Sequence, residues 1–212
     1  MFASLLRMTA KYGYSNVRDQ LFKDLKGAYP TKWESYQAAE VLGEDIFEPP
    51  KPHPNAVLNL FLEQNVRFAL PFAAYRASIA GFSALMSDKP GMVLPRHAIA
   101  TITHGMHLVR SFMDQAARVI VYEECLGVCV ERGCMLSVHT DQRKRRAEAL
   151  KKLYHAISFV GRDGGVLGPL SLGDLVCASC TEDIEASHTR SRSICWEQLP
   201  SMFSVTQSWD GV

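Results

Sequence analysis

The sequence has no cysteine before Cys125, although six cysteines occur in the whole chain. No secretory signal precedes them, because Arg7 and Lys11 interrupt the first apolar residues. We therefore expect reduced thiols and a cytoplasmic or nuclear location rather than a disulfide framework. The two cations and Arg18, with no acid before Asp19, would also suit a mitochondrial presequence, but an ordinary helix is the favoured interpretation.

Charge of one sign is not in excess, because 23 Lys and Arg residues accompany 22 Asp and Glu residues and the formal net charge is +1. The whole molecule has no field that would attract nucleic acid or anionic lipid, so we expect neither as its main partner. Long apolar runs are absent too: the best window, Phe68 to Met86, is interrupted by Pro71, Arg76 and Gly81. A membrane-spanning helix is therefore not expected.

Alternation of apolar and polar residues, which is typical of strands, is nearly absent, whereas apolar residues three and four positions apart recur along the chain. We therefore predict an all-α fold, an irregular array of several helices. The expected helices run from Phe2 to Tyr12, from Ser15 to Pro30, from Lys32 to Leu42, from Asn55, from Leu70, from Pro95 to about Cys125, from Thr140 or Asp141, and from about Thr181 to Gln198.

Particular residues indicate where these helices begin and end and which side of each is buried. Asn55 is the expected cap of its helix, and Pro200 is expected to lie beyond the end of the last one. The longest helix should bury one side, formed by Ile99, Ile102, Met106, Val109, Phe112, Ala116 and Val119. The helix after it should turn inward Leu150, Leu153, Tyr154 and Ile157.

Four prolines between Glu48 and Asn55 remove backbone donors and hold the chain extended. This stretch is predicted to be a linker or an exposed loop. It divides the chain into a helical segment at 1–48 and a C-terminal helical domain at 55–212.

Three segments together resemble fungal BTB/POZ proteins of the basidiomycete, or mushroom, type. Residues 5–18, with Lys11-Tyr12 followed by Val17-Arg18, are similar to the closing helices of a BTB/POZ domain. Residues 70–78 fit the middle region of those fungal proteins. Their C-terminal tail is similar to residues 175–180 and 196–203, and Trp209 occupies the position of a late tryptophan.

The resemblance implies a non-enzymatic protein–protein interaction module of the BTB/POZ-associated class, with a protein as its partner. The sequence lacks the sheet and the earlier helices of a full BTB domain, which form much of its dimerising surface. Dimerisation and docking to a cullin ligase are therefore not carried over, and the oligomeric state stays open.

Two cysteine pairs have the spacing of zinc ligands, with four residues between Cys129 and Cys134 and two between Cys177 and Cys180. A short turn can direct both thiolates of a pair at one tetrahedral centre. The pairs would then form a structural zinc site that joins the end of the long helix to the start of the last one, with His139 as a substitute ligand. Alternatively, these cysteines pack as small apolar side chains, the role expected for the other two.

The only concentrated basic run consists of Arg143, Lys144, Arg145 and Arg146. It suits a nuclear-import signal or a local nucleic-acid contact, although a solvated helix face is the commoner explanation. Combined with the zinc site, it defines the alternative function, a structural zinc protein whose basic helix contacts nucleic acid.

Three aromatic residues, Trp196, Phe203 and Trp209, accompany the last amphipathic segment. They are expected to fold back onto the helices, since each can bury a large apolar area. If they stay exposed, they would form an anchor for a partner protein.

No catalytic signature accompanies the histidines or cysteines. His104 and His107 lack the neighbouring glutamate of a zinc-protease motif, and Gly161 to Gly165 lacks the lysine of a phosphate loop. We therefore predict that the chain is not an enzyme.

Overall fold

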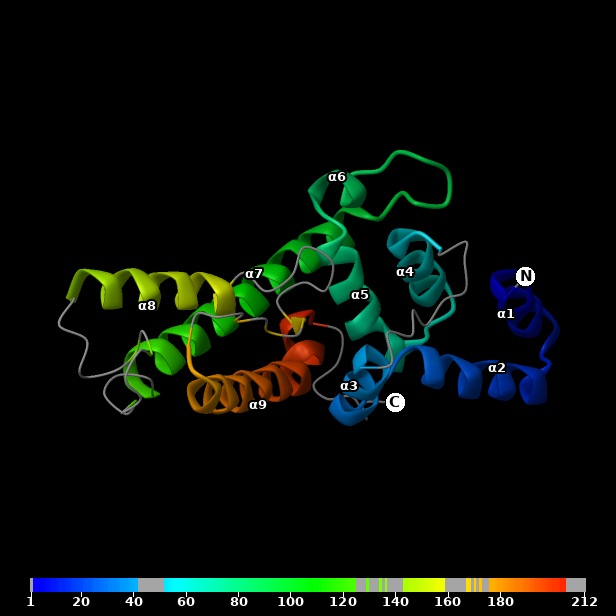
Figure 1. The fold of residues 1–212 in the computed structure, drawn as a ribbon. Coiled ribbons are helices and arrows are strands. Elements are labelled where there is room, and N and C mark those ends of the chain that lie inside the picture. Colours follow the sequence, from blue (N-terminus) through cyan, green and yellow to red (C-terminus); the bar gives the residue numbers. More distant parts are fainter. Residues whose placement is uncertain are drawn as a thin grey trace. The chain divides into compact units, whose positions relative to one another are not determined.

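The computed structural model describes residues 2–41, 52–124, 143–158 and 176–204, together with residues 129, 134, 136, 167, 168, 170 and 172. Within these residues every regular element is a helix, so the predicted all-α class and irregular array are confirmed (Figure 1). The elements are α1 (Phe2–Tyr12), α2 (Ser15–Ala28), α3 (Trp33–Val41), α4 (Pro54–Glu63), η1 (Arg67–Ala69), α5 (Leu70–Ile79), α6 (Phe82–Leu85), α7 (Arg96–Val119), η2 (Ile120–Glu124), α8 (Arg143–Ser158) and α9 (Ala178–Met202).

The chain forms two compact units. The first contains residues Met1–Met106 and Glu197–Val212, and the second contains His107–Trp196. The long helices α7 and α9 each contribute residues to both units. This grouping by contacts differs from the segments 1–48 and 55–212, which follow the linker and the resemblance and stay a prediction.

Short-range signals set several of the helix boundaries. Gly13 ends α1 with a φ of 71°, a left-handed conformation that suits glycine, and the N–H of Tyr14 donates to the carbonyl of Thr9. At α4, His53 is the cap, because its side chain accepts a hydrogen bond from the N–H of Asn55 at 3.3 Å. The predicted cap at Asn55 is therefore wrong by two positions.

Asn55 instead anchors a distant loop. Its side chain is buried, and its Nδ2 atom donates to the carbonyl of Ala84 at 2.7 Å and to that of Met92 at 3.2 Å. Two long-range acceptors thus satisfy the NH2 group of a side chain that local reasoning assigns to capping.

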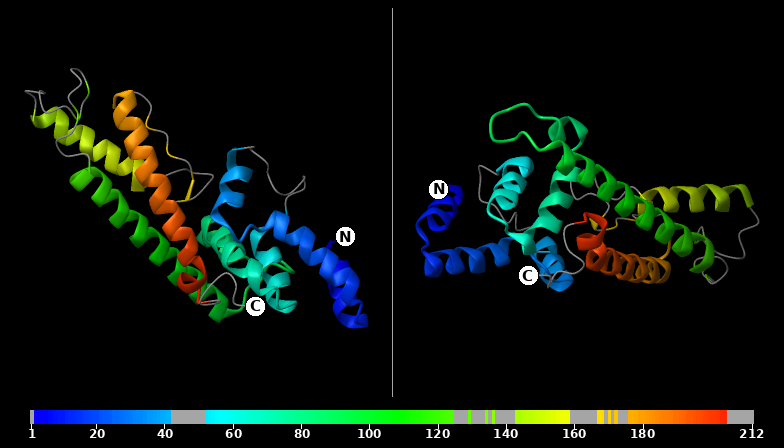
Figure 2. Two further views of the ribbon diagram at one scale, coloured as in Figure 1. Left: turned by 90° about the horizontal axis from the view of Figure 1, so that it is seen from below. Right: turned by 180° about the vertical axis from the view of Figure 1, so that it is seen from behind.

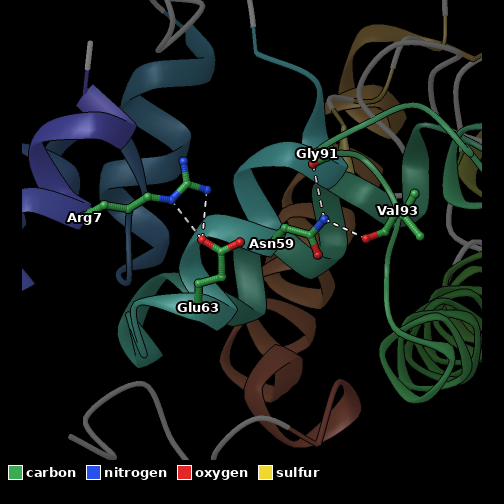
Figure 3. Close-up of polar contacts among 5 residues, drawn as sticks. All are labelled: Arg7, Asn59, Glu63, Gly91 and Val93. Carbon is green, nitrogen blue, oxygen red and sulfur yellow. Dashed lines mark hydrogen bonds and ion pairs between the residues drawn. The ribbon is translucent and has the colours of Figure 1, made fainter. Parts of the chain in front are cut away.

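Two further side chains of α4, those of Asn59 and Glu63, also make long-range polar contacts (Figure 3). Asn59, one turn after Asn55, donates to the carbonyls of Gly91 at 3.3 Å and Val93 at 2.8 Å. Glu63, a further turn along, accepts from the guanidinium of Arg7 in α1 at 2.9 Å and 3.1 Å. These contacts tie α4 to the segment that leads into α7 and to α1.

The core of the first unit is built around α5, which is buried on nearly all of its surface. Such a helix must be apolar all round, and its sequence from Leu70 to Ile79 has one charge, Arg76. Aromatic rings from neighbouring helices meet edge to face around it, with ring centroids 4.7 Å apart for Tyr29 and Phe61 and 5.9 Å for Tyr29 and Phe72.

The buried side of α7 is displaced from the predicted one. Ile102 and Val109 are buried as expected. The other buried residues of α7 are Ala98, Gly105, Met113 and Ala117. The other predicted positions, Ile99, Met106, Phe112, Ala116 and Val119, are only partly buried. Ala98, Gly105 and Ala117 are small, so they let neighbouring side chains approach the helix closely, and a pattern weighted toward large apolar residues misses them.

The end of α9 also differs from the prediction. The helix continues to Met202 with Pro200 inside it, although Pro200 was expected to lie beyond its end. Proline removes one backbone donor, which a helix tolerates best near its end. The N–H of Phe203 still donates to the carbonyl of Leu199 at 3.0 Å, so the last turn stays closed.

The second unit packs three helical segments around one core (Figure 2). Leu150, Leu153 and Ile157 of α8 are buried there as predicted, and Tyr154 is partly buried. The hydroxyl of Tyr154 donates to a carboxylate oxygen of Asp114 in α7, whose other oxygen accepts from Arg118 Nε at 3.1 Å. This polar contact fastens the outer edge of α8 to α7.

Length alone does not make a membrane span. The helices α7 and α9 contain 24 and 25 residues, but both carry charged side chains along their length. Among the described helices, none combines the length and the apolar composition that crossing a bilayer requires.

Candidate metal centre

Four cysteines from two distant stretches of the chain meet in the second unit. Cys129 and Cys134 lie between η2 and α8, whereas Cys177 directly precedes α9 and Cys180 lies in its first turn. All four have their Sγ atoms within 4.8 Å of one another, in a geometry that could hold a metal ion. The structure therefore brings together the complete set of cysteines predicted as ligands.

The separations between sulfur atoms match one coordination geometry. The Sγ atoms of Cys129 and Cys177 lie 3.6 Å apart, and those of Cys134 and Cys180 lie 3.9 Å apart. Four thiolates placed tetrahedrally at about 2.3 Å from Zn²⁺ would be about 3.8 Å from each other. A disulfide would require about 2.05 Å, so the cluster has the dimensions of a tetrathiolate site rather than of two disulfides.

Backbone amides point at two of these sulfur atoms. The pKa of the Cys134 thiol lies below its ordinary value: burial raises it, but hydrogen bonds from the N–H groups of Cys177 and Leu136, together with those from neighbouring thiols, lower it more. The N–H of Cys180 likewise donates to Cys177. Amide donors stabilise a thiolate, the form of cysteine that binds metals.

Two of the other thiols, those of Cys177 and Cys180, resist losing their protons while no cation is present. The N–H of Cys180 lowers the pKa of Cys177, but burial and hydrogen bonds with Cys129 and Cys134 raise it by a larger amount. Burial is also the main reason why the pKa of Cys180 is raised, and the nearby charge of Cys134 adds to it. A divalent cation would reverse this balance, because it compensates the several negative charges at once.

The cluster borders the apolar core of its unit. Cys129 and Cys134 are buried and belong to the same core as Leu136, Leu153 and Ile184. Cys177 and Cys180 are half-buried and pack against that core from its edge. Four protein ligands fill a tetrahedral centre and leave no position for a substrate, as in structural metal sites.

The two remaining cysteines were predicted to be core residues. Cys195 has no exposed surface, and burial raises its pKa to about 12, so its thiol is an inert packing group as predicted. Cys125 lies outside the described residues, as does the substitute ligand His139.

The basic run occupies the first turn of α8. Residues Arg143, Lys144, Arg145 and Arg146 are helical, but their side chains lie outside the described part of the structure. Their role in nuclear import or nucleic-acid contact stays a prediction.

Two of the three aromatic residues predicted as a partner anchor are buried. Trp196 is 1% exposed in the second unit, and Phe203 has no exposed surface in the first. Both rings fold back onto the helices, the arrangement expected from the sequence, and neither is accessible as an exposed anchor in this structure. Trp209 lies outside the described residues.

Sequence reasoning missed a buried basic pair on α9. His188 and Arg192 lie one turn apart, and both are buried. Arg192 Nε donates to the carbonyl of Leu167 at 2.7 Å. Burial, with the positive charge of Arg192, lowers the pKa of His188 to about 4. The available signal was the repeat of four residues from Ile184 to His188 and again to Arg192, because it places both on the buried side of the helix.

Comparisons of the chain with protein-family models, with curated proteins and with solved structures found no match. The resemblance to BTB/POZ proteins is neither supported nor opposed by them. The cysteine cluster is therefore the feature on which a functional proposal depends.

Proposed function

We propose that the four clustered cysteines bind Zn²⁺ and that the chain is a non-enzymatic helical scaffold whose second unit is held together by that ion. The observation that carries the proposal is the convergence of the four sulfur atoms within 4.8 Å. Packing as small apolar side chains does not by itself account for four cysteine sulfur atoms lying so close together.

The ligand set favours zinc over other cations. Thiolates are soft ligands that select zinc or iron, whereas Ca²⁺ and Mg²⁺ prefer oxygen. Four protein ligands leave no open position for a water or a substrate, the arrangement of structural rather than catalytic zinc. Iron in the same four-sulfur site is the competing occupant, and its colour distinguishes it from zinc.

Zinc would stabilise the second unit by joining segments that are far apart in sequence. The contact between Cys129 and Cys177 closes a loop across 48 positions, and α8 lies within that loop. Closing such a loop costs conformational entropy, which the metal–sulfur bonds offset. The scaffold would thus fold fully only in the presence of the metal.

Elemental analysis of protein purified under reducing conditions without added zinc tests the proposal. We expect about one zinc per chain for the natural sequence and much less for Cys134→Ser, which removes one of the four sulfur ligands. The matched control is Cys195→Ala, because this cysteine is buried outside the cluster and its loss should leave the zinc content unchanged. Metal-free natural protein that is fully folded would contradict the proposal, as would bound iron.

The broader role we propose is that of a protein–protein interaction module of the BTB/POZ-associated class. Besides the resemblance, one feature of the first unit supports it. Leu5, Met8 and Tyr12 share one side of α1 and are 38%, 51% and 57% exposed. Neighbouring exposed apolar side chains are typical of surfaces that bind other proteins.

Site-specific photo-crosslinking in cells tests this role. A crosslinker at Met8 should capture one discrete partner, and Tyr12→Ser should abolish that product. The control is a crosslinker at Phe82, which is 68% exposed elsewhere in the same unit. Equal products from both positions, or none from either, would contradict the proposal. The alternative nucleic-acid role gains no support from the described side chains.

A further inference from the structure

The four sulfur atoms contact one another across the two stretches of chain that hold them. Cys129 is in contact with Cys177, and Cys134 is in contact with Cys180, at 3.6 Å and 3.9 Å. Each contact therefore joins the segment before α8 to the start of α9. A disulfide along either contact requires the two sulfur atoms to approach by less than about 2 Å.

Each contact also pairs a half-buried cysteine residue with a buried one. Cys177 and Cys180 are half-buried at the edge of the unit, whereas Cys129 and Cys134 are buried, with 8% and 6% of their surface exposed. A small oxidant from solvent would reach Cys177 or Cys180 first. The buried partner then lies in position to attack the oxidised sulfur before water or a second oxidant does.

The geometry points to an oxidised form of the same centre, in which hydrogen peroxide releases Zn²⁺ and disulfides form between Cys129 and Cys177 and between Cys134 and Cys180. This inference rests on the proposed zinc site and describes its regulation. The two disulfides join the same two segments that the metal joins. Oxidation therefore exchanges one crosslink for another and does not unfold the unit.

The chemistry balances with peroxide as the only oxidant. The thiolate of Cys177 attacks one oxygen of the peroxide, the O–O bond breaks, hydroxide leaves and a sulfenic acid forms. The thiolate of Cys129 then attacks that sulfur, the S–S bond forms and a second hydroxide leaves. Two electrons pass from the sulfur pair to the peroxide. The same sequence at Cys180 and Cys134 consumes a second peroxide and leaves Zn²⁺ without ligands.

The competing product joins cysteines within each stretch, Cys129 to Cys134 and Cys177 to Cys180. Such disulfides would also release the metal, but they would leave the start of α9 unattached to the segment before α8. The two outcomes thus predict different connectivities and different stabilities of the metal-free oxidised protein.

The experiment treats the full zinc-loaded chain with hydrogen peroxide and follows zinc release with a chromogenic chelator. The disulfides are then mapped by mass spectrometry without reduction. Trypsin separates Cys129 from Cys134 by cleaving after Arg132, and fragmentation of the peptide between Ala178 and Ser179 assigns the other two cysteines. The control Cys195→Ala should give the same map.

We expect one zinc released for every two peroxides, disulfides between the stretches, and recovery of zinc binding after a thiol reductant. Disulfides within the stretches as the main product would overturn the inference, as would zinc retained after peroxide or zinc lost to sulfinic acids without disulfides. Failure of the untreated protein to bind zinc would instead contradict the proposed function, so the two failures are distinguishable.

Discussion

Cys129 and Cys177 place their Sγ atoms 3.6 Å apart although they are separated by 48 positions and by the whole of α8. The contact connects the segment after the π-helical turn η2 to the residue that precedes α9. Together with Cys134 and Cys180, it defines a four-sulfur cluster at the edge of an apolar core.

Removal of zinc should loosen the second unit selectively. A strong chelator withdraws the crosslink between the cluster's two segments, and a ligand present at a thousand times its dissociation constant stabilises the folded state by about 4 kcal/mol. Hydrogen exchange of α8 and of residues 178–196 should therefore accelerate by at least about tenfold, while α5 stays protected. Equal acceleration in both units would contradict a local role for the metal.

Gly105→Ala should destabilise the first unit. A Cβ atom at this position would lie 2.4 Å from Cδ1 of Phe203, whose ring packs directly on the helix. Overpacking of this kind costs about 1–3 kcal/mol of unfolding free energy. Gly27→Ala is the matched control, because Gly27 is also helical and has no atom within 4 Å of a built Cβ. The control should be neutral or more stable by up to about 1 kcal/mol, and denaturant titrations of both variants measure the difference.

Asn55→Ala should cost more stability than Asn59→Ala. Both side chains donate to two carbonyls of the segment between Ala84 and Val93, but Asn55 is buried and Asn59 is only partly buried. An acceptor that is shielded from water and loses its donor costs about 1–3 kcal/mol, whereas water replaces a lost donor more easily at the more accessible Asn59. Equal losses for the two variants in urea titrations would contradict the anchoring role of Asn55.

Acid should weaken the second unit through His188. The pKa of this side chain is lowered to about 4 by burial and by the charge of Arg192, so the folded state favours the neutral imidazole. The contribution of His188 to the free energy of unfolding is fully present above the ordinary pKa of about 6.5. It falls as the pH decreases toward 4, because the unfolded chain takes up the proton first. The loss over this interval should amount to at most about 3 kcal/mol.

Unfolding free energies measured between pH 7 and pH 4 test this account. His188→Gln removes the titrating group and should flatten the pH dependence, whatever its effect on stability at pH 7. His104→Gln, at an exposed position of α7, is the control and should retain the slope of the natural protein. An unchanged slope in His188→Gln would show that other groups cause the acid sensitivity.

The spacing of apolar residues and the residues that begin or end helices predict most of the helices, because both signals act within a few residues. The predicted α1 agrees with the observed bounds, and α8 buries Leu150, Leu153 and Ile157 as expected. Asn55 shows the limit of local reasoning. Its partners Ala84 and Met92 are 29 and 37 positions away, so nothing near it in the sequence distinguishes an anchor from a cap.

The metal centre, too, is predictable only in part from the sequence. Spacing identifies Cys129, Cys134, Cys177 and Cys180 as candidate ligands, since each short pair has the reach of a chelating turn. Their meeting depends on how α8 and α9 return beside α7, which is a property of the packed unit. For the same reason the sequence could not indicate that sulfur contacts run between the pairs, nor that His188 would be buried.

X-ray absorption at the zinc edge of the purified, reduced protein identifies the atoms bound to the metal. We predict a single shell of four sulfur neighbours at about 2.3 Å, the signature of a tetrathiolate site. In Cys134→Ser, any zinc that remains should show three sulfurs and one lighter neighbour. A shell of nitrogen and oxygen atoms in the natural protein, or the absence of zinc from the folded chain, would contradict the account.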